Sequence, residues 1–153
     1  MNQAEAAFDS CGICCLNLPA AYEVFAGDLW RVRHSQETNI LGYCILEPRR
    51  HFLDLSEARR EEIHDYGLLL AQIMKAQREI LECQRVYTFS LAEAVPHFHV
   101  HVIPRAKEFV QAFKGRGIMS YPVHPAADAN LVENVVEALK GHFRRNPIEL
   151  SNS

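Results

Sequence analysis

The sequence predicts an α+β domain built on an antiparallel sheet, and two observations support that fold class. Short β-prone runs stand before and after one long helical pattern, and a second helical pattern follows near the C-terminus. Consecutive β-prone runs are close enough in sequence to pair as hairpins, which favours an antiparallel sheet over alternating βαβ units. Neither G-x-G-x-x-G nor G-x-x-x-x-G-K-[ST] occurs, so the two common nucleotide-binding loops are absent from the sequence.

The predicted strands are bounded by residues that interrupt strands. Gly27-Asp28 separates two β-prone runs in "YEVFAGDLWRVRH", which is typical of a hairpin. Pro48 ends a third run, and Pro96 and Pro104 bracket the last one. The β-prone segments are 22–34 with its hairpin, 41–48 ("LGYCILEP"), 85–92 ("RVYTFSLA") and 97–103 ("HFHVHVI").

Two helices complete the predicted fold. Ser56 is the predicted N-cap of the long helix, where the following glutamates suit the positive end of the helix dipole. Asp128 is the predicted N-cap of the C-terminal helix. Each helix has one apolar stripe at helical spacing, and Gln77 is the one polar member of the first. The stripes are Ile63, Tyr66, Gly67, Leu70, Ile73, Met74, Gln77, Ile80 and Leu81, and then Leu131, Val132, Val135, Val136, Leu139 and Phe143.

Length and composition narrow the class of protein. The 153 residues suit a single domain over 1–153, with a core at about 9–143 and short flexible tails. A net charge of -3 argues against a nucleic-acid or anionic-membrane partner. The apolar runs are shorter than the roughly 20 residues of a membrane-spanning helix. The start, "MNQAEAAFDS", lacks the basic and apolar regions of a secretory signal, so we expect a cytoplasmic protein.

The cysteines suggest a metal site. Five cysteines are an odd number, and we expect reduced thiols in the cytoplasm. Together with His51 and His97, the pair Cys11-x-x-Cys14 would make a Cys2His2 set, which closes a tetrahedral structural zinc site. Two alternatives stay open: the thiols have no function, or they form a redox pair. The second is disfavoured because "CCLNLP" does not form the helix that follows a thioredoxin-like motif.

The segment "PHFHVHVIPR" places three of the eight histidines at alternate positions. On a strand His97, His99 and His101 share one face, and Phe98 and Val100 lie on the other. Neighbouring histidines are then about 6.6 Å apart and the outer two about 13 Å apart. Zinc–imidazole bonds are about 2.0–2.1 Å, so all three cannot bind one ion. We therefore expect the three imidazoles to have different roles.

His99 and His101 suit a two-step displacement at phosphorus. A neutral imidazole is both a nucleophile toward phosphorus and a leaving group from it, and it titrates near neutral pH. We predict that His99 attacks a phosphoryl group and that His101 bonds a phosphate or bridging oxygen. The alternatives are histidines that are merely exposed or satisfied in the core, and a metallohydrolase, which the distances disfavour.

These segments resemble the histidine-triad (HIT) family, whose motif is His-x-His-x-His followed by apolar residues. "CGIC" resembles the cysteines of its zinc-bearing branch, and "EPRRHFLDLSEARREEI" resembles its Pro-Lys-Arg-His segment with the helix that follows. The resemblance covers roughly residues 9–143. It implies a HIT-like antiparallel sheet of about five strands with one long helix and a C-terminal helix, and a homodimer.

The resemblance also implies a function. Family members are nucleotide hydrolases or nucleotidyl transferases that cleave a phosphoanhydride or phosphoramidate, and diadenosine polyphosphate hydrolases are among them. His99 would form the covalent nucleotidyl-histidine intermediate, and His101 would assist at the phosphate. In the zinc-bearing branch, and in the related galactose-1-phosphate uridylyltransferases, four residues hold a structural Zn²⁺. Their counterparts here are Cys11, Cys14, His51 and His97.

The stretch before the triad departs from the family pattern. Ala92-Glu93 stands where Gly-Gln is usual, and no Asn-x-Gly precedes it. Tyr43 replaces a common histidine, and the second strand offers "WRVRH" where an acid often binds ribose. We expect a dinucleoside polyphosphate-like substrate that is bound by Ser90, Glu93 and Arg105. The alternative is a nucleotide-binding or sensing module with little catalysis.

Overall fold

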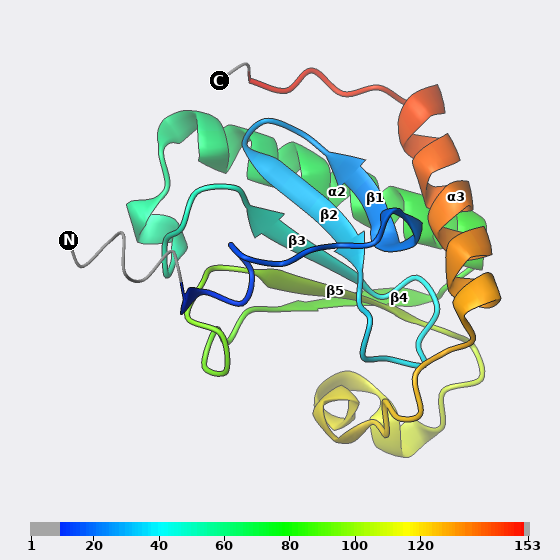
Figure 1. The fold of residues 1–153 in the computed structure, drawn as a ribbon. Coiled ribbons are helices and arrows are strands. Elements are labelled where there is room, and N and C mark those ends of the chain that lie inside the picture. The colour runs from blue at the N-terminus through cyan, green and yellow to red at the C-terminus, as the bar shows by residue number, and fades with distance from the viewer. Residues whose placement is uncertain (1–9, 152–153) are drawn as a thin grey trace.

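The computed structural model describes residues 10–151, which form a five-stranded antiparallel sheet with helices on one face (Figure 1). The strand order is β1-β2-β3-β5-β4, and every neighbouring pair is antiparallel. The predicted fold class is therefore confirmed. The strands are β1 (Glu23–Ala26), β2 (Trp30–His34), β3 (Cys44–Pro48), β4 (Arg85–Phe89) and β5 (Val100–Arg105). The helical elements include α2 (Arg60–Leu81), α3 (Ala129–Arg145), η1 (Ala20–Tyr22), η2 (Leu55–Glu57), η3 (Gln111–Phe113) and η4 (Gly115–Ser120).

The first three strands lie close to where the sequence predicts them. β1 and β2 form the predicted hairpin around Gly27-Asp28. β3 begins at Cys44, later than predicted, because Gly42 lies in a turn. Gly42 has a φ of 79°, and a Cβ atom at this position would lie 2.2 Å from Cδ1 of Leu81. Only glycine suits a turn that packs this closely against the end of α2.

The strand that carries the triad differs from its prediction. β5 begins later than expected and includes Pro104, which was expected to lie beyond its end. The start is delayed because the backbone N–H of Phe98 donates to the carbonyl of Phe52 at 2.7 Å instead of to a neighbouring strand. β3 pairs with β5 only as far as Val102, so Pro104, which has no N–H, interrupts no bond to β3. His97 consequently lies in a bend before the strand.

The start of α2 was also predicted wrongly, because Ser56 is not its N-cap. Ser56 lies in η2, where its backbone N–H donates to the Asp54 carboxylate at 2.8 Å. The helix itself begins at Arg60. There the carboxylate of Glu62 accepts the backbone N–H of Arg59 at 2.7 Å. The carboxylate that accepts this backbone N–H at the start of α2 thus comes from within the first turn of the helix.

The predicted cap of α3 is confirmed, whereas Ile63 and Gly67 of the first predicted stripe and Leu131 of the second are exposed. The Asp128 carboxylate accepts the backbone N–H groups of Asn130 at 2.9 Å and of Leu131 at 3.3 Å. Leu131 is 51% exposed and Ile63 is 49% exposed, because both lie near the start of their helices and beyond the edge of the core. Val132, Val136 and Leu139 form the buried face of α3 as predicted.

Most of the predicted N-terminal tail lies in residues 1–9, outside the described part of the chain. After α3 the chain returns over α2, and the backbone N–H of Ser151 donates to the Asp65 carboxylate at 2.8 Å. The described part of the C-terminal tail is therefore bonded to the domain. Within residues 10–151, no helix has both the length and the apolarity needed to cross a bilayer.

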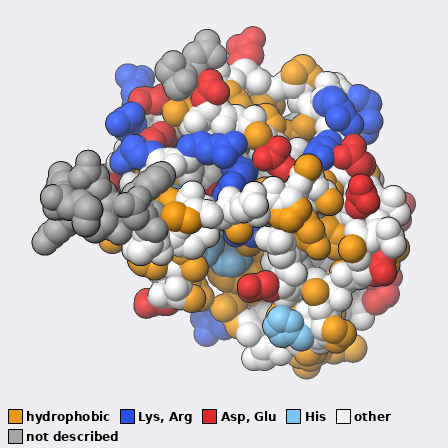
Figure 2. All heavy atoms as spheres, in the orientation of Figure 1, with side chains coloured by type: hydrophobic (Ala, Val, Ile, Leu, Met, Phe, Trp, Pro, Cys, Tyr) orange, Lys and Arg blue, Asp and Glu red, His pale blue; other side chains and the backbone are white. Residues whose placement is uncertain are grey.

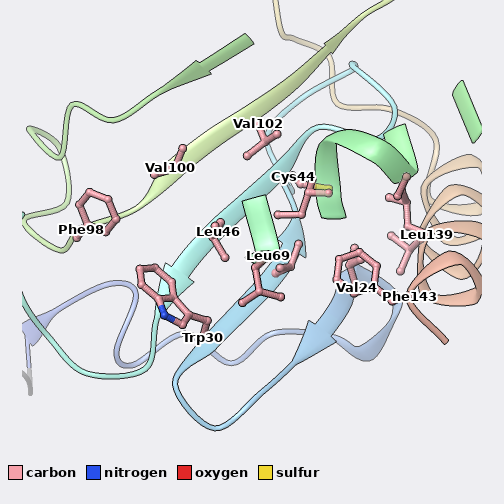
Figure 3. Close-up of a cluster of buried hydrophobic side chains, with 14 of the residues drawn as sticks. Val24, Trp30, Cys44, Leu46, Leu69, Phe98, Val100, Val102, Leu139 and Phe143 are labelled. Carbon is pink, nitrogen blue, oxygen red and sulfur yellow. The ribbon is translucent and has the colours of Figure 1, made fainter. Parts of the chain in front are cut away.

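The main core lies between the sheet and the helices α2 and α3 (Figure 3). Trp30 is 1% exposed, and its indole N–H donates to the backbone carbonyl of Glu62 at 2.9 Å. A smaller cluster, which includes Tyr43 and Ile45, lies apart from this core and packs against residues of η4 and of β4. The side chains of His99 and His101 are only partly buried, whereas Val100 between them belongs to the main core.

Gln77, the polar member of the α2 stripe, ties the helix to the sheet. Its side chain is fully buried, and Nε2 donates to the carbonyls of Gly42 at 2.8 Å and Val102 at 2.9 Å. We expect Gln77→Leu to lower the free energy of unfolding by about 1–3 kcal/mol, because two buried carbonyls lose a donor. Urea denaturation measures the change. Lys75→Gln, at an exposed position of α2, is the control and should change stability by less than about 0.5 kcal/mol.

Ala92 adopts a backbone conformation that glycine favours. Its φ is 53°, in the left-handed region, where a Cβ atom costs roughly 1–2 kcal/mol. We expect Ala92→Gly to stabilise the protein by about 0.5–1 kcal/mol, since relief of this strain exceeds the added entropy of the unfolded chain. Thermal and urea unfolding test this. Ala94→Gly in the same loop, where φ is not positive, should destabilise the protein, and equal effects of the two changes would contradict the explanation.

Candidate active site and metal centre

Two cysteines and two histidines from three distant segments meet beside the start of β5. Cys11 and Cys14 lie in a turn before β1, His51 follows β3, and His97 precedes β5. Sγ of Cys14 is 3.3 Å from Nδ1 of His97 and 3.5 Å from Nδ1 of His51, and Sγ of Cys11 is 3.4 Å from Nδ1 of His97. One ligand atom from each of the four residues lies within 4.8 Å of the others. The four predicted ligands therefore form a possible metal site.

The distances in this cluster fit tetrahedral coordination. Bonds of about 2.3 Å to sulfur and 2.0–2.1 Å to nitrogen at a tetrahedral angle separate the two atoms by about 3.5 Å. The orientation of His97 fits as well, because its Nε2 lies 3.1 Å from the carbonyl oxygen of Pro48. A carbonyl only accepts, so Nε2 carries the proton and the Nδ1 lone pair faces the thiols. The donor set is thus arranged as a zinc ligand set would be.

His99 is held in one tautomer by the backbone. Its Nδ1 lies 2.7 Å from the carbonyl oxygen of His97, which can only accept a hydrogen bond. Nδ1 therefore carries the proton, and Nε2 has the lone pair that a nucleophile needs. The His99 ring is 4.9 Å from the ring of His101, centroid to centroid, as the alternating pattern predicted.

His101 is kept neutral by its surroundings. Burial, with smaller contributions from His99 and Arg33, lowers the pKa of His101 to about 4. Its Nδ1 lies 2.8 Å from the hydroxyl of Tyr43, and burial raises the pKa of that hydroxyl to about 12. The Tyr43 O–H can thus donate to Nδ1, which leaves the Nε2–H of His101 as a donor. Phe89 stacks on the other side of the imidazole at 4.6 Å.

The two imidazoles line a cavity of about 530 Å³, within the range of small-molecule sites. In Figure 2, histidine atoms lie in a hollow of the face shown, beside basic side chains. Gly12 and Ile13, which lie between Cys11 and Cys14, also border this cavity. The four possible metal ligands, called the metal cluster below, are therefore neighbours of the two imidazoles. The lining of the cavity includes Gly12, Ile13, Leu16, Arg33, residues 35–38, Tyr43, Ile45, residues 91–95, His99, His101 and Val123.

The predicted substrate-binding residues do not all reach this cavity. Glu93 lines it, whereas Ser90 and Arg105 do not. Arg105 is four residues beyond His101 on β5, a distance of about 13 Å along a strand. Its guanidinium is buried and donates to the side-chain oxygen of Gln84 at 2.8 Å. The structure therefore groups Glu93 with the two imidazoles and leaves Ser90 and Arg105 apart from them.

Tyr43 and Arg33 line the cavity and were not among the predicted site residues. Tyr43 was noted only as a departure from the family, yet it bonds His101. Arg33 was noted only as a basic residue of the second strand, yet it lines the cavity. The sequence alone could not reveal this, because the register between neighbouring strands is a property of the folded sheet. β2 and β3 pair Arg33 with Ile45, next to His101.

Comparisons with known proteins agree with this geometry. The HIT domain model matches residues 21–108. A zinc-bound histidine triad family protein from Mycobacterium smegmatis has a similar structure, with a TM-score of 0.68 at 17% identity over 90% of this chain and 96% of that chain. A histidine triad protein from Marinobacter aquaeolei VT8 gives 0.69 at 18% identity over 81% and 89% of the two chains.

A third similar structure is Plasmodium falciparum diadenosine triphosphate hydrolase in complex with Cyclomarin A. Its TM-score is 0.65 at 14% identity, over 86% of this chain and 82% of that chain. A search of curated proteins gives no match. The relationship to galactose-1-phosphate uridylyltransferases stays a prediction. Because the HIT domain model matches more than half of the chain and the fold agrees with HIT structures, the chain belongs to the HIT family.

Proposed function

We propose that the protein is a nucleotide hydrolase or nucleotidyl transferase that works through a covalent nucleotidyl intermediate on His99. The observation that carries this proposal is the fixed tautomer of His99, whose Nδ1 lies 2.7 Å from the His97 carbonyl oxygen. That bond leaves Nε2 as the nucleophilic atom. A neutral His101, at a ring distance of 4.9 Å, supplies the neighbouring hydrogen-bond donor.

The proposed reaction has two displacements. In the first, Nε2 of His99 forms a bond to phosphorus while the bond from phosphorus to the leaving group breaks. The Nε2–H of His101 donates to the leaving atom or to a phosphate oxygen. The charge that develops on the His99 ring is stabilised by the bond from Nδ1–H to the His97 carbonyl. In the second displacement, water or another acceptor attacks phosphorus and His99 leaves as a neutral imidazole.

Zn²⁺ is the proposed metal, held by Cys11, Cys14, His51 and His97. Four protein ligands complete a tetrahedral site and leave no position for a reacting water, so the proposed role is structural. The metal would fasten the N-terminal turn and the segment after β3 to the backbone that orients His99. The residues of this chain, rather than the metal, then carry the chemistry at phosphorus.

The proposed substrate is a dinucleoside polyphosphate or a related nucleotide phosphoanhydride or phosphoramidate. The similarity to a diadenosine triphosphate hydrolase supports this class, and the cavity of about 530 Å³ accommodates a nucleotide. A homodimer and a cytoplasmic location remain part of the proposal. The alternative, a binding or sensing module, has the same pocket and differs in forming no covalent adduct.

Loss of one zinc ligand should remove the metal. We expect the purified native protein to contain about one zinc per chain, and Cys14→Ser to lose it, because three ligands hold the ion much less tightly. The melting temperature should fall by roughly 5 °C or more. Elemental analysis and thermal unfolding measure both. Cys15→Ser is the matched control, since Cys15 is outside the four-residue set, and it should keep its zinc. A zinc-free native protein contradicts the assignment.

Loss of the nucleophile should abolish turnover. We expect His99→Ala to lower the turnover of a dinucleoside polyphosphate on the order of 10³-fold or more, with zinc content and melting temperature retained. His64→Ala, which removes an exposed histidine of α2, is the control and should keep the native rate. Mass spectrometry of quenched native enzyme should find a nucleotidyl adduct on the peptide that contains His99. Nucleotide binding with neither turnover nor adduct would instead support the binding module.

A further inference from the structure

We propose that Arg33 forms a second phosphate-binding position in the cavity, for a phosphate other than the one that His99 attacks. The inference rests on the proposed function, because that function places the reacting phosphate at the two imidazoles. The ligand class is a nucleotide with at least two phosphate groups.

The sheet places Arg33 and His101 in one row. Arg33 pairs with Ile45 across β2 and β3, and Ile45 pairs with His101 across β3 and β5. All three residues line the same cavity, so their side chains emerge on the same face. Two interstrand spacings separate the Cα atoms of Arg33 and His101 by about 10 Å. A nucleotide whose reacting phosphate contacts His101 can therefore present a second phosphate to Arg33.

The charges around Glu47 do not balance. Glu47 is 1% exposed, and two guanidinium groups contact it. Arg31 donates through Nε at 2.7 Å, and its Nη2 also contacts the carboxylate. Arg33 donates only through Nε, at 3.2 Å and 3.1 Å to the two oxygens. One arginine would suffice to neutralise one carboxylate, so the trio keeps a net positive charge, and of the two arginines only Arg33 lines the cavity.

The terminal amino groups of Arg33 are the donors that remain. They have no hydrogen-bond partner among the described residues, whereas Nη2 of Arg31 also donates to the carbonyl of Ile13 at 3.4 Å. A guanidinium suits phosphate because its paired N–H groups can donate to two oxygens at once. Glu47 fixes Nε and so orients these groups before a ligand arrives, which reduces the entropy lost on binding.

The acidic residues of the cavity do not cancel this charge. Glu37 and Glu93 also line the cavity, but both are exposed, and water and salt screen exposed charges. The side chain of Arg33 is only 12% exposed, so its interaction with a phosphate is screened less. The exposed carboxylates would repel an anion at the rim of the cavity. Arg33 would attract an anion that reaches the sheet at the bottom of the cavity.

Two positions of the second phosphate have the same chemistry. It can be the next phosphate along a polyphosphate chain, or it can be a phosphate on the ribose. Adenosine monophosphate, adenosine diphosphate and adenosine 3′,5′-bisphosphate separate these cases, because they share the base, the sugar and the first phosphate. Titration calorimetry of each nucleotide with the native zinc-containing protein measures binding without any need for turnover.

We expect native protein to bind at least one of the two-phosphate nucleotides about tenfold or more tightly than the monophosphate. A preference for the diphosphate identifies a position along the chain, and a preference for the bisphosphate identifies a position at the ribose. Arg33→Gln should reduce the preference to about unity. Arg31→Gln is the matched control: it also removes one arginine from Glu47, but Arg31 does not line the cavity, so the preference should persist. Zinc content and melting temperature verify that both variants fold.

Three results would overturn the inference. They are a native protein with no preference or no binding, an Arg33→Gln variant with the native preference, and an Arg31→Gln variant that loses as much preference as Arg33→Gln. Failure of the proposed function looks different, because it leaves no turnover and no His99 adduct while the binding preference persists. Turnover with a His99 adduct, but without tighter binding of the two-phosphate nucleotides, would overturn only the proposed second phosphate position.

Discussion

The site depends on the position of one residue, His97. Its ring has Nδ1 at 3.4 Å and 3.3 Å from the sulfurs of Cys11 and Cys14, and Nε2 at 3.1 Å from the Pro48 carbonyl. Its own backbone carbonyl accepts the Nδ1–H of His99 at 2.7 Å. The residue therefore links the metal cluster to the tautomer of the nucleophile within a bend of the chain. Anything that moves this bend disturbs both, so a metal bound at the proposed site would stabilise the backbone that orients His99.

The second imidazole is supported by the sheet rather than by the metal cluster. Tyr43 comes from the segment before β3 and bonds Nδ1 of His101, and Phe89 comes from the end of β4 and stacks on the ring. Burial of this ring keeps it neutral, and a neutral ring close to His99 does not repel the charge that develops there during attack. Different supports thus hold the two imidazoles, although His99 directly precedes β5 and His101 lies within it.

The sequence predicted the parts of the site that depend on period and chemistry. The alternating positions of His99 and His101 predicted that their side chains lie together. The metal-binding chemistry of cysteine and histidine indicated the four residues of the metal cluster. What it missed depends on contacts between distant segments. The bend at His97 arises because the N–H of Phe98 donates to the carbonyl of Phe52. Ser56 is not the N-cap of α2, because the helix begins after Arg59, whose N–H donates to the Glu62 carboxylate. Arg105 lies apart from the cavity for a different reason, because the rise of about 3.3 Å per residue separates it from His101.

The segment "LAEAV" contributes both an unusual backbone conformation and a carboxylate to the pocket. Ala92 has a φ of 53°, so the backbone adopts a glycine-like conformation without glycine. Glu93 in turn places a carboxylate at the rim, while Arg33, two strands from His101, places a guanidinium on the sheet. A cavity that is negative at its rim and positive on the sheet orients an anionic ligand with its phosphates inward. Both departures from the family pattern then act together: in the proposed function they would influence how a nucleotide enters the cavity, and they leave the geometry of His99 unchanged.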